Sequence, residues 1–217
     1  MSSRVELKAK AKQIVHDNLS TVIKTMLIYF VLVFITTMLD RNLFAVAKTG
    51  YVSVFTTILT VLTGFGLLSF YFKLARGDAA NASYKDIFSK CKMAIPYFLI
   101  MLVTGIFVCL WSILFIIPGI IAAFKYSMAT YLYLDDPSLG VMGSINKSKE
   151  ITNGHKMDLF ALELSFIGWF ILGMLTLGIL YLWIIPYLGV SVVLFYDEIA
   201  GNNKKPVESP ENKEVTE

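Results

Sequence analysis

The chain has 217 residues, of which 56% are hydrophobic and only 16% are charged, and its mean hydropathy is +0.67. Soluble domains carry about 25% charged residues, so this composition excludes an ordinary soluble domain and indicates a membrane protein. The net charge of +3 is small, and we expect membrane lipids rather than nucleic acid as partners.

The N-terminal segment, residues 3–17, has an apolar stripe at helical spacing. Its members are Leu7, Ala11, Ile14 and Val15, and the lysines lie largely off this stripe. Two interpretations remain open. The segment is either a helix lying on an anionic membrane surface with its lysines toward the headgroups, or a solvated helical lead-in to the first span.

Long apolar runs separated by short polar segments follow. A bilayer core about 30 Å thick requires about 20 helical residues. The expected spans are residues 22–39, 51–72, 94–111, 114–134, 159–176 and 179–196. The sequence therefore predicts an all-α polytopic membrane domain over residues 1–200, with six transmembrane helices in three hairpins and short cytoplasmic interfacial helices. The polar tail, residues 201–217, is expected to be disordered.

The uncharged run from Met93 to Phe124 must contain a turn, because it would be roughly 48 Å long as one helix. Proline disfavours helix in the residue before it and cannot complete an intrahelical hydrogen bond. We therefore expect the chain to turn between Trp111 and Pro118. In the last hairpin, the turn is expected at residues 175–178, which leaves Pro186 as a kink in the sixth span.

Two segments resemble each other, which predicts a repeat. Each places Ile-Ile-Pro after an apolar helix, at Pro118 and Pro186, and each ends on an acidic pair, at residues 135–136 and 197–198. A basic segment precedes each hairpin, and the N-terminal segment with the first two spans has the same layout without the proline. Hairpins in the same orientation form a parallel repeat, unlike the inverted repeats of many transporters.

The distribution of Lys and Arg predicts the orientation. All but three of these residues lie in the N-terminal segment through Lys24, the 73–92 loop, the 135–158 segment and the tail. The exceptions are Arg41, Lys48 and Lys125. The positive-inside rule therefore places the N- and C-termini in the cytoplasm of a multi-pass plasma-membrane protein.

No catalytic constellation stands out in the sequence. The two histidines, His16 and His155, lie in basic segments and are too few for a multi-histidine metal site. Neither a phosphate-binding glycine loop nor a dinucleotide fingerprint is present. We therefore expect no catalytic residues, no metal and no cofactor.

Three charged residues fall within expected spans. Lys24 lies near enough to the end of its span to snorkel, which leaves Lys125 and Glu163. A charge near the bilayer centre costs about 2.5–3.5 kcal/mol on insertion scales, so it is expected to be paired or to face water. Two interpretations remain open here as well. Lys125 and Glu163 form an intramembrane ion pair, or Lys125 snorkels alone and Glu163 lies at the inner headgroups.

The segments "FIIPGIIAAFKYSMATYLYLDDP" and "INKSKEITNGHKMDLFALELSFIGW" carry a family resemblance. Over about residues 60–200 the chain resembles the bacterial integral-membrane family catalogued as domain of unknown function 975. That resemblance implies a polytopic membrane protein without an established activity. The family is also similar to the membrane domain that precedes some glycerophosphodiester phosphodiesterases, whose soluble catalytic domain this sequence lacks. The carotenoid-oxygenase label of some members implies four iron-binding histidines, and this sequence has two.

Three functions are compatible with these features. The first is a non-enzymatic membrane component that binds lipid, anionic on the cytoplasmic face, or a membrane-protein partner or second copy of itself. The alternative is a small transporter or an accessory subunit for export or efflux, in which Lys125 and Glu163 line a polar path. A membrane enzyme acting on lipid is the third.

Overall fold

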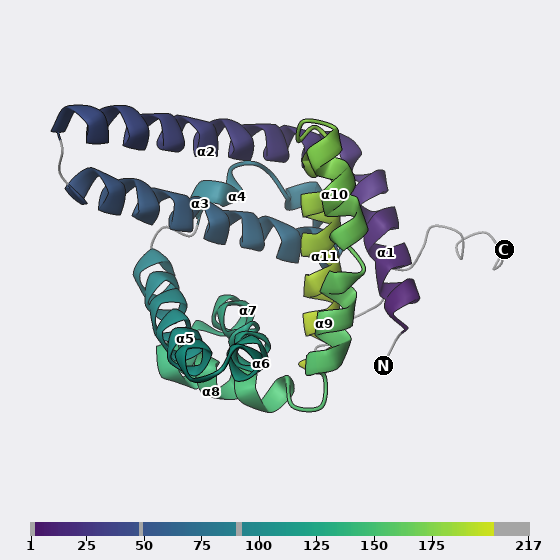
Figure 1. The fold of residues 1–217 in the computed structure, drawn as a ribbon. Helices are drawn as coiled ribbons and strands as arrows, with labels where there is room; N and C mark the ends of the chain where they lie inside the picture. Colours follow the sequence, from purple (N-terminus) through teal and green to yellow (C-terminus); the bar gives the residue numbers. More distant parts are fainter. Residues whose placement is uncertain (1–2, 48–49, 90–92, 202–217) are drawn as a thin grey trace, which may run out of the picture.

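The computed structural model describes residues 3–47, 50–89 and 93–201, and all regular structure in these ranges is helical (Figure 1). In chain order the helices are α1 (Arg4–Asp17), α2 (Leu19–Ala47), α3 (Gly50–Ala75), α4 (Asp86–Ser89), α5 (Ala94–Leu114), α6 (Ile116–Tyr126), α7 (Ala129–Asp135), α8 (Gly140–Ile151), α9 (Lys156–Leu164), α10 (Ile167–Leu175) and α11 (Tyr181–Ile199). Short 3-10 turns cover Ala79–Asn81 and Pro137–Leu139. The expected all-α class is confirmed, whereas the predicted disorder after Gly201 lies outside the described residues.

Within the described ranges, five helical segments are long and apolar enough to cross a membrane. They are Leu19–Arg41, Thr56–Ala75, Ile95–Ile113, Lys156–Leu175 and Tyr181–Ile199. The span expected over residues 114–134 is not among them, and the structure divides this stretch into α6 and α7 at Ser127 and Met128. The Ser127 hydroxyl donates a hydrogen bond to the carbonyl of Phe124 at 2.9 Å, and such back-bonding competes with the helical ladder.

Both expected turns lie where the sequence placed them. Between α5 and α6, Phe115 is extended, with φ −157° and ψ 145°. Between α10 and α11, Leu177 and Gly178 both have positive φ, at 53° and 88°, a region that glycine enters at little cost and leucine rarely does.

Neither proline ends a helix, and Pro186 lies within the last long helix, as the sequence predicted. Pro118 is the third residue of α6, where its missing N–H has no intrahelical partner to lose. Pro186 lies inside α11, which continues to Ile199. What the two positions share is a place near the beginning of the second helix of a hairpin.

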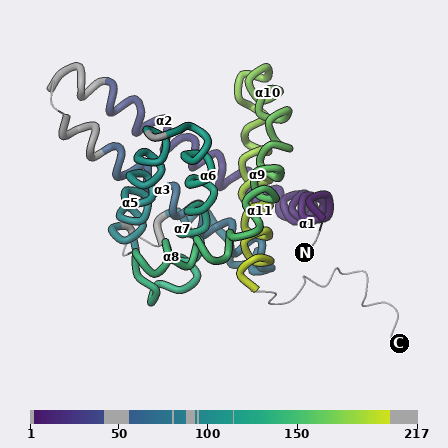
Figure 2. Tube along the Cα trace, turned by 60° about the horizontal axis from the view of Figure 1, so that its bottom comes forward, coloured from purple at the N-terminus to yellow at the C-terminus, as the bar shows by residue number. Residues whose placement is uncertain are grey.

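The chain divides into three units, each a short helix followed by a hairpin: α1–α3, α4–α7 and α8–α11. The short helix α4 packs on α3, and α8 packs on α5, α6 and α7, so each lies on the hairpin of the preceding unit. The first short helix, α1, packs on α11 of the last unit, on the side away from α5 (Figures 1 and 2). This contact closes the three units into a ring.

The apolar stripe of α1 is covered by protein, which differs from both interpretations of this segment. Leu7, Ala11 and Val15 are at most 4% exposed, because this face packs against α11. Lys8, beside the stripe, donates a hydrogen bond from Nζ to the Ser165 hydroxyl at 3.1 Å. Its ammonium lies 4.5 Å from the centre of the Phe166 ring, and burial lowers the pKa of Lys8.

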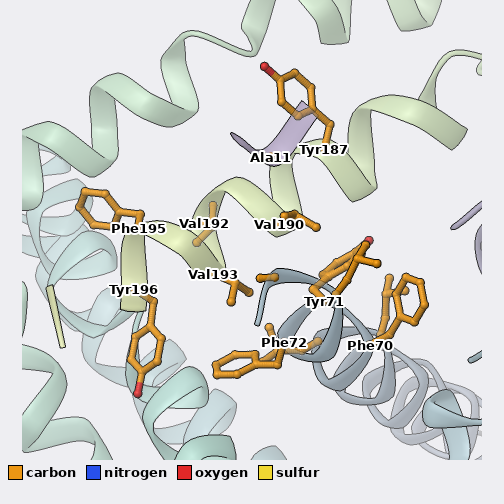
Figure 3. Close-up of a cluster of buried hydrophobic side chains, with 14 of the residues drawn as sticks. Ala11, Phe70, Tyr71, Phe72, Tyr187, Val190, Val192, Val193, Phe195 and Tyr196 are labelled. Carbon is orange, nitrogen blue, oxygen red and sulfur yellow. The ribbon is translucent and has the colours of Figure 1, made fainter. Parts of the chain in front are cut away.

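The central contact of the ring is between α3 and α11. In the ribbon view α3 runs across the direction of α11 (Figure 1). Tyr71 and Phe72 of α3 lie against the α11 face that carries Val190 and Val193 (Figure 3), and all four side chains are buried. This contact positions the features described next.

Candidate functional site

The three hairpins end at one charged cluster. Arg76 directly follows α3 and donates hydrogen bonds to Asp135 from Nη1 and to Asp197 from Nη2, each at 2.6 Å. Its Nε donates a further bond to the Asp197 carboxylate at 3.2 Å. Asp135 ends α7, and Asp197 lies in the last turn of α11. The ends of α3, α7 and α11 therefore meet on the same side of the molecule.

The electrostatics of the surrounding helix ends explain why a cation is stable at this position. The C-terminal end of a helix carries partial negative charge, and three such ends meet here together with two carboxylates. Partial burial opposes the charge on Arg76, but the hydrogen bonds and charges of Asp197 and Asp135 outweigh it and raise the pKa of the guanidinium. The Arg76 side chain, 31% exposed, lies over the Phe72 ring at 4.7 Å.

One aromatic ring from each hairpin packs behind the charged cluster. The ring centres of Phe72 and Tyr131 are 5.8 Å apart, those of Phe72 and Tyr196 are 5.6 Å apart, and those of Tyr131 and Tyr196 are 5.7 Å apart. These separations are typical of favourable aromatic pairs. The Tyr196 hydroxyl also donates to Asp135 at 3.2 Å, so the aromatic and charged groups support each other.

A pocket of about 290 Å³ lies next to these rings. Its lining includes Tyr71 from α3, Ser127 and Tyr131 from the α6–α7 region, and Leu188 and Val192 from α11. Residues of all three hairpins therefore enclose it. Gly189 of α11 also lines the pocket. A larger residue would not fit at this position, because a Cβ there would lie only 2.4 Å from the Tyr71 ring.

Glu163 of α9 also lines the pocket. Its side chain is exposed, so the pocket reaches the outside of the chain at this residue. Among the described residues, the Glu163 carboxylate forms no ion pair and accepts no hydrogen bond. The break between α9 and α10 follows immediately, at Ser165 and Phe166.

No ion pair joins Lys125 and Glu163, and Lys125 does not line the pocket. The neighbouring Phe124 faces α9, with its ring centre 5.7 Å from that of Phe160. Adjacent helical residues point about 100° apart, so Lys125 is directed elsewhere, and its ammonium lies 5.8 Å from the Tyr126 ring centre.

The backbone at Lys125 is held by α8. Its carbonyl accepts hydrogen bonds from the hydroxyls of Ser148 and Thr152 at 3.0 and 3.3 Å. The Lys149 ammonium, also on α8, lies 5.7 Å from the centre of the Tyr126 ring, which Lys125 contacts as well. Lys125 thus belongs to the contact between α6 and α8 and does not line the pocket.

Sequence reasoning missed Arg76 and the pocket tyrosines as site residues. A signal for Arg76 was present, because the repeat places acidic residues at the ends of two hairpins and a basic residue at the end of the first. No such signal marked Tyr71 and Tyr131, since tyrosines at span ends are ordinarily membrane-interface residues.

The five long apolar helices in the described part of the chain indicate a helical membrane protein. Residues 113–203 match the model of a family described as protein of unknown function, DUF975. The resemblance to this family expected from the sequence is thereby confirmed over residues 113–203. No curated protein and no solved structure matches the chain.

Proposed function

We propose that the protein is a non-enzymatic membrane component that holds part of a bilayer amphiphile in the pocket between its three hairpins. The pocket itself is the observation that carries this proposal. It is lined mainly by apolar and aromatic side chains with few polar groups, which is the usual character of a small-molecule site.

The size of the pocket supports a headgroup or one chain end as the bound part. One water occupies about 30 Å³ in the liquid, so the pocket of about 290 Å³ has room for about ten atoms of similar size. The rest of the amphiphile would remain in the bilayer, which the pocket reaches at Glu163.

We place the protein in the plasma membrane with both termini in the cytoplasm. Exposed lysines on the short helices support this, including Lys10 and Lys12 on α1 and Lys147 on α8. Each basic residue near an anionic surface contributes about 1 kcal/mol to its attraction. Acidic lipids are therefore the second proposed partner, at the cytoplasmic surface rather than in the pocket.

Transport is the alternative function, and the helix breaks favour it. The breaks at Ser127–Met128 and Ser165–Phe166 both lie beside the pocket or at the residues next to it. Discontinuous helices border substrate sites in many transporters. Uptake or release of a bound amphiphile by sealed vesicles containing the purified protein would distinguish transport from simple binding.

Thermal unfolding of the purified protein in dodecyl maltoside tests pocket binding, with C12 amphiphiles as probes. Leu188→Trp places a larger side chain into the pocket, and Ile171→Trp places the same side chain at an exposed position of α10 as a control. We expect at least one of dodecylamine, dodecanol and dodecanoate to raise the melting temperature of the wild type and of Ile171→Trp, but not of Leu188→Trp. An equal response of all three proteins, or no response to any probe, would contradict the proposal.

A further inference from the structure

We infer that the pocket selects an amphiphile with a singly charged ammonium headgroup, which pairs with the Glu163 carboxylate. This inference rests on the proposed function and adds the chemical class of the ligand. The inference rests on the position of the Glu163 carboxylate. This residue lies within a candidate span, has no ion partner among the described residues and lines an aromatic and apolar pocket.

Among the residues that the structure describes, Glu163 is the one charged side chain that lines the pocket. A carboxylate within a bilayer is costly unless a cation or hydrogen-bond donor compensates it, and the described residues supply neither. A ligand that brings a positive charge removes this cost, whereas a neutral ligand leaves it and an anionic ligand increases it. Charge complementarity therefore favours a cation.

Three cations that lie on or beside the elements lining the pocket have other contacts. Lys125 lies over Tyr126, Lys8 donates to Ser165, and Arg76 binds Asp135 and Asp197. None of these groups is paired with Glu163, so a counter-charge must come from outside the described residues. The bilayer at the pocket opening is its nearest source.

An organic ammonium fits the lining better than a metal ion. Calcium takes six to eight oxygen ligands and magnesium six, whereas this pocket has one carboxylate. Tyr71 and Tyr131 line the same space, and aromatic rings attract ammonium groups by cation–π interaction. The apolar surface of Leu188 and Val192 suits the first methylenes of an alkyl chain.

Three probes with the same chain length test the selection by charge. Dodecylamine, dodecanol and dodecanoate differ mainly in the headgroup, and each is titrated against the purified protein at pH 7 while the melting temperature is measured. Glu163→Gln removes the charge with little change of shape. Glu150→Gln makes the same change at an exposed position of α8 outside the pocket.

We expect dodecylamine to bind the wild type at least about tenfold more tightly than dodecanol, because an ion pair to a carboxylate is a strong, charge-assisted hydrogen bond. Glu163→Gln should reduce amine binding to the level of the alcohol, and Glu150→Gln should leave the preference intact. Equal binding of amine and alcohol, or an amine preference that survives Glu163→Gln, would overturn the inference. If amine and alcohol bound equally but Leu188→Trp still abolished their binding, the proposed pocket function would stand and only the selection by Glu163 would be wrong. If the wild type bound none of the three probes, both the proposed function and the inference would be wrong.

Discussion

Removal of the Arg76 side chain should destabilise the protein more than any single exposed charge does. Its guanidinium contacts Asp135 and Asp197 at 2.6 Å each, and the two carboxylate side chains are 24% and 14% exposed. Without Arg76 these carboxylates would remain close to each other and to three helix ends of the same sign. Arg76→Ala therefore removes a favourable contact and leaves an unfavourable one.

The magnitude follows from the burial of the cluster. Exposed ion pairs contribute about 0–1 kcal/mol, and loss of one partner of a fully buried pair costs about 3–5 kcal/mol. Arg76 is 31% exposed and lies between these limits, so we expect Arg76→Ala to lower the free energy of unfolding by about 2–3 kcal/mol. Arg76→Lys should recover only part of this, because one ammonium lacks the planar fork that reaches both carboxylates.

Unfolding by sodium dodecyl sulfate in mixed dodecyl maltoside micelles measures this difference, with exposed Arg4→Ala as the control. A double-mutant cycle of Arg76→Ala with Asp135→Asn then isolates the pair. We expect a coupling energy of about 1 kcal/mol or more, since the two residues are in direct contact. Additive losses in the double variant, or an Arg76→Ala protein as stable as Arg4→Ala, would refute the role of Arg76 in joining the hairpins.

Two further changes test the packing of the short helices. Gly66→Ala should cost at least about 2 kcal/mol, because its Cβ would lie 2.1 Å from the Ile87 carbonyl oxygen of α4. The control Gly64→Ala, with no atom within 4 Å of its Cβ, should be neutral or slightly stabilising. Equal unfolding midpoints for the two variants would contradict the close contact of α3 and α4. Lys8→Ala should cost about 0.5–1.5 kcal/mol by removing the hydrogen bond to Ser165, and Lys10→Ala, which loses only an exposed pair, should cost less than about 0.5 kcal/mol. If the order of the two lysine variants is reversed in the same unfolding measurement, α1 is not held to α9–α10 as the structure has it.

Local chemistry was enough to predict the class of the protein and the places where its chain turns. The length of the apolar runs and the scarcity of charge indicate membrane helices, since a bilayer requires both. The positions of Pro118 and of residues 175–178 predict the turns before α6 and after α10, since backbone preferences act over only a few residues. The same local signals did not reveal the break at Ser127 within the span expected over residues 114–134.

The tertiary structure alone decided which charged groups meet. The sequence left open whether Lys125 and Glu163, the charged residues of adjacent expected spans, form an intramembrane pair. In the structure, ion pairs join Arg76 to residues 59 and 121 positions away. Likewise, the apolar stripe of α1 could be predicted from the sequence, but the helix that packs on it, α11, lies at the other end of the chain. Helical periodicity determines which side chains share a face, whereas the partner of that face depends on how the three hairpins close around α3 and α11, and no property of a single segment contains that information.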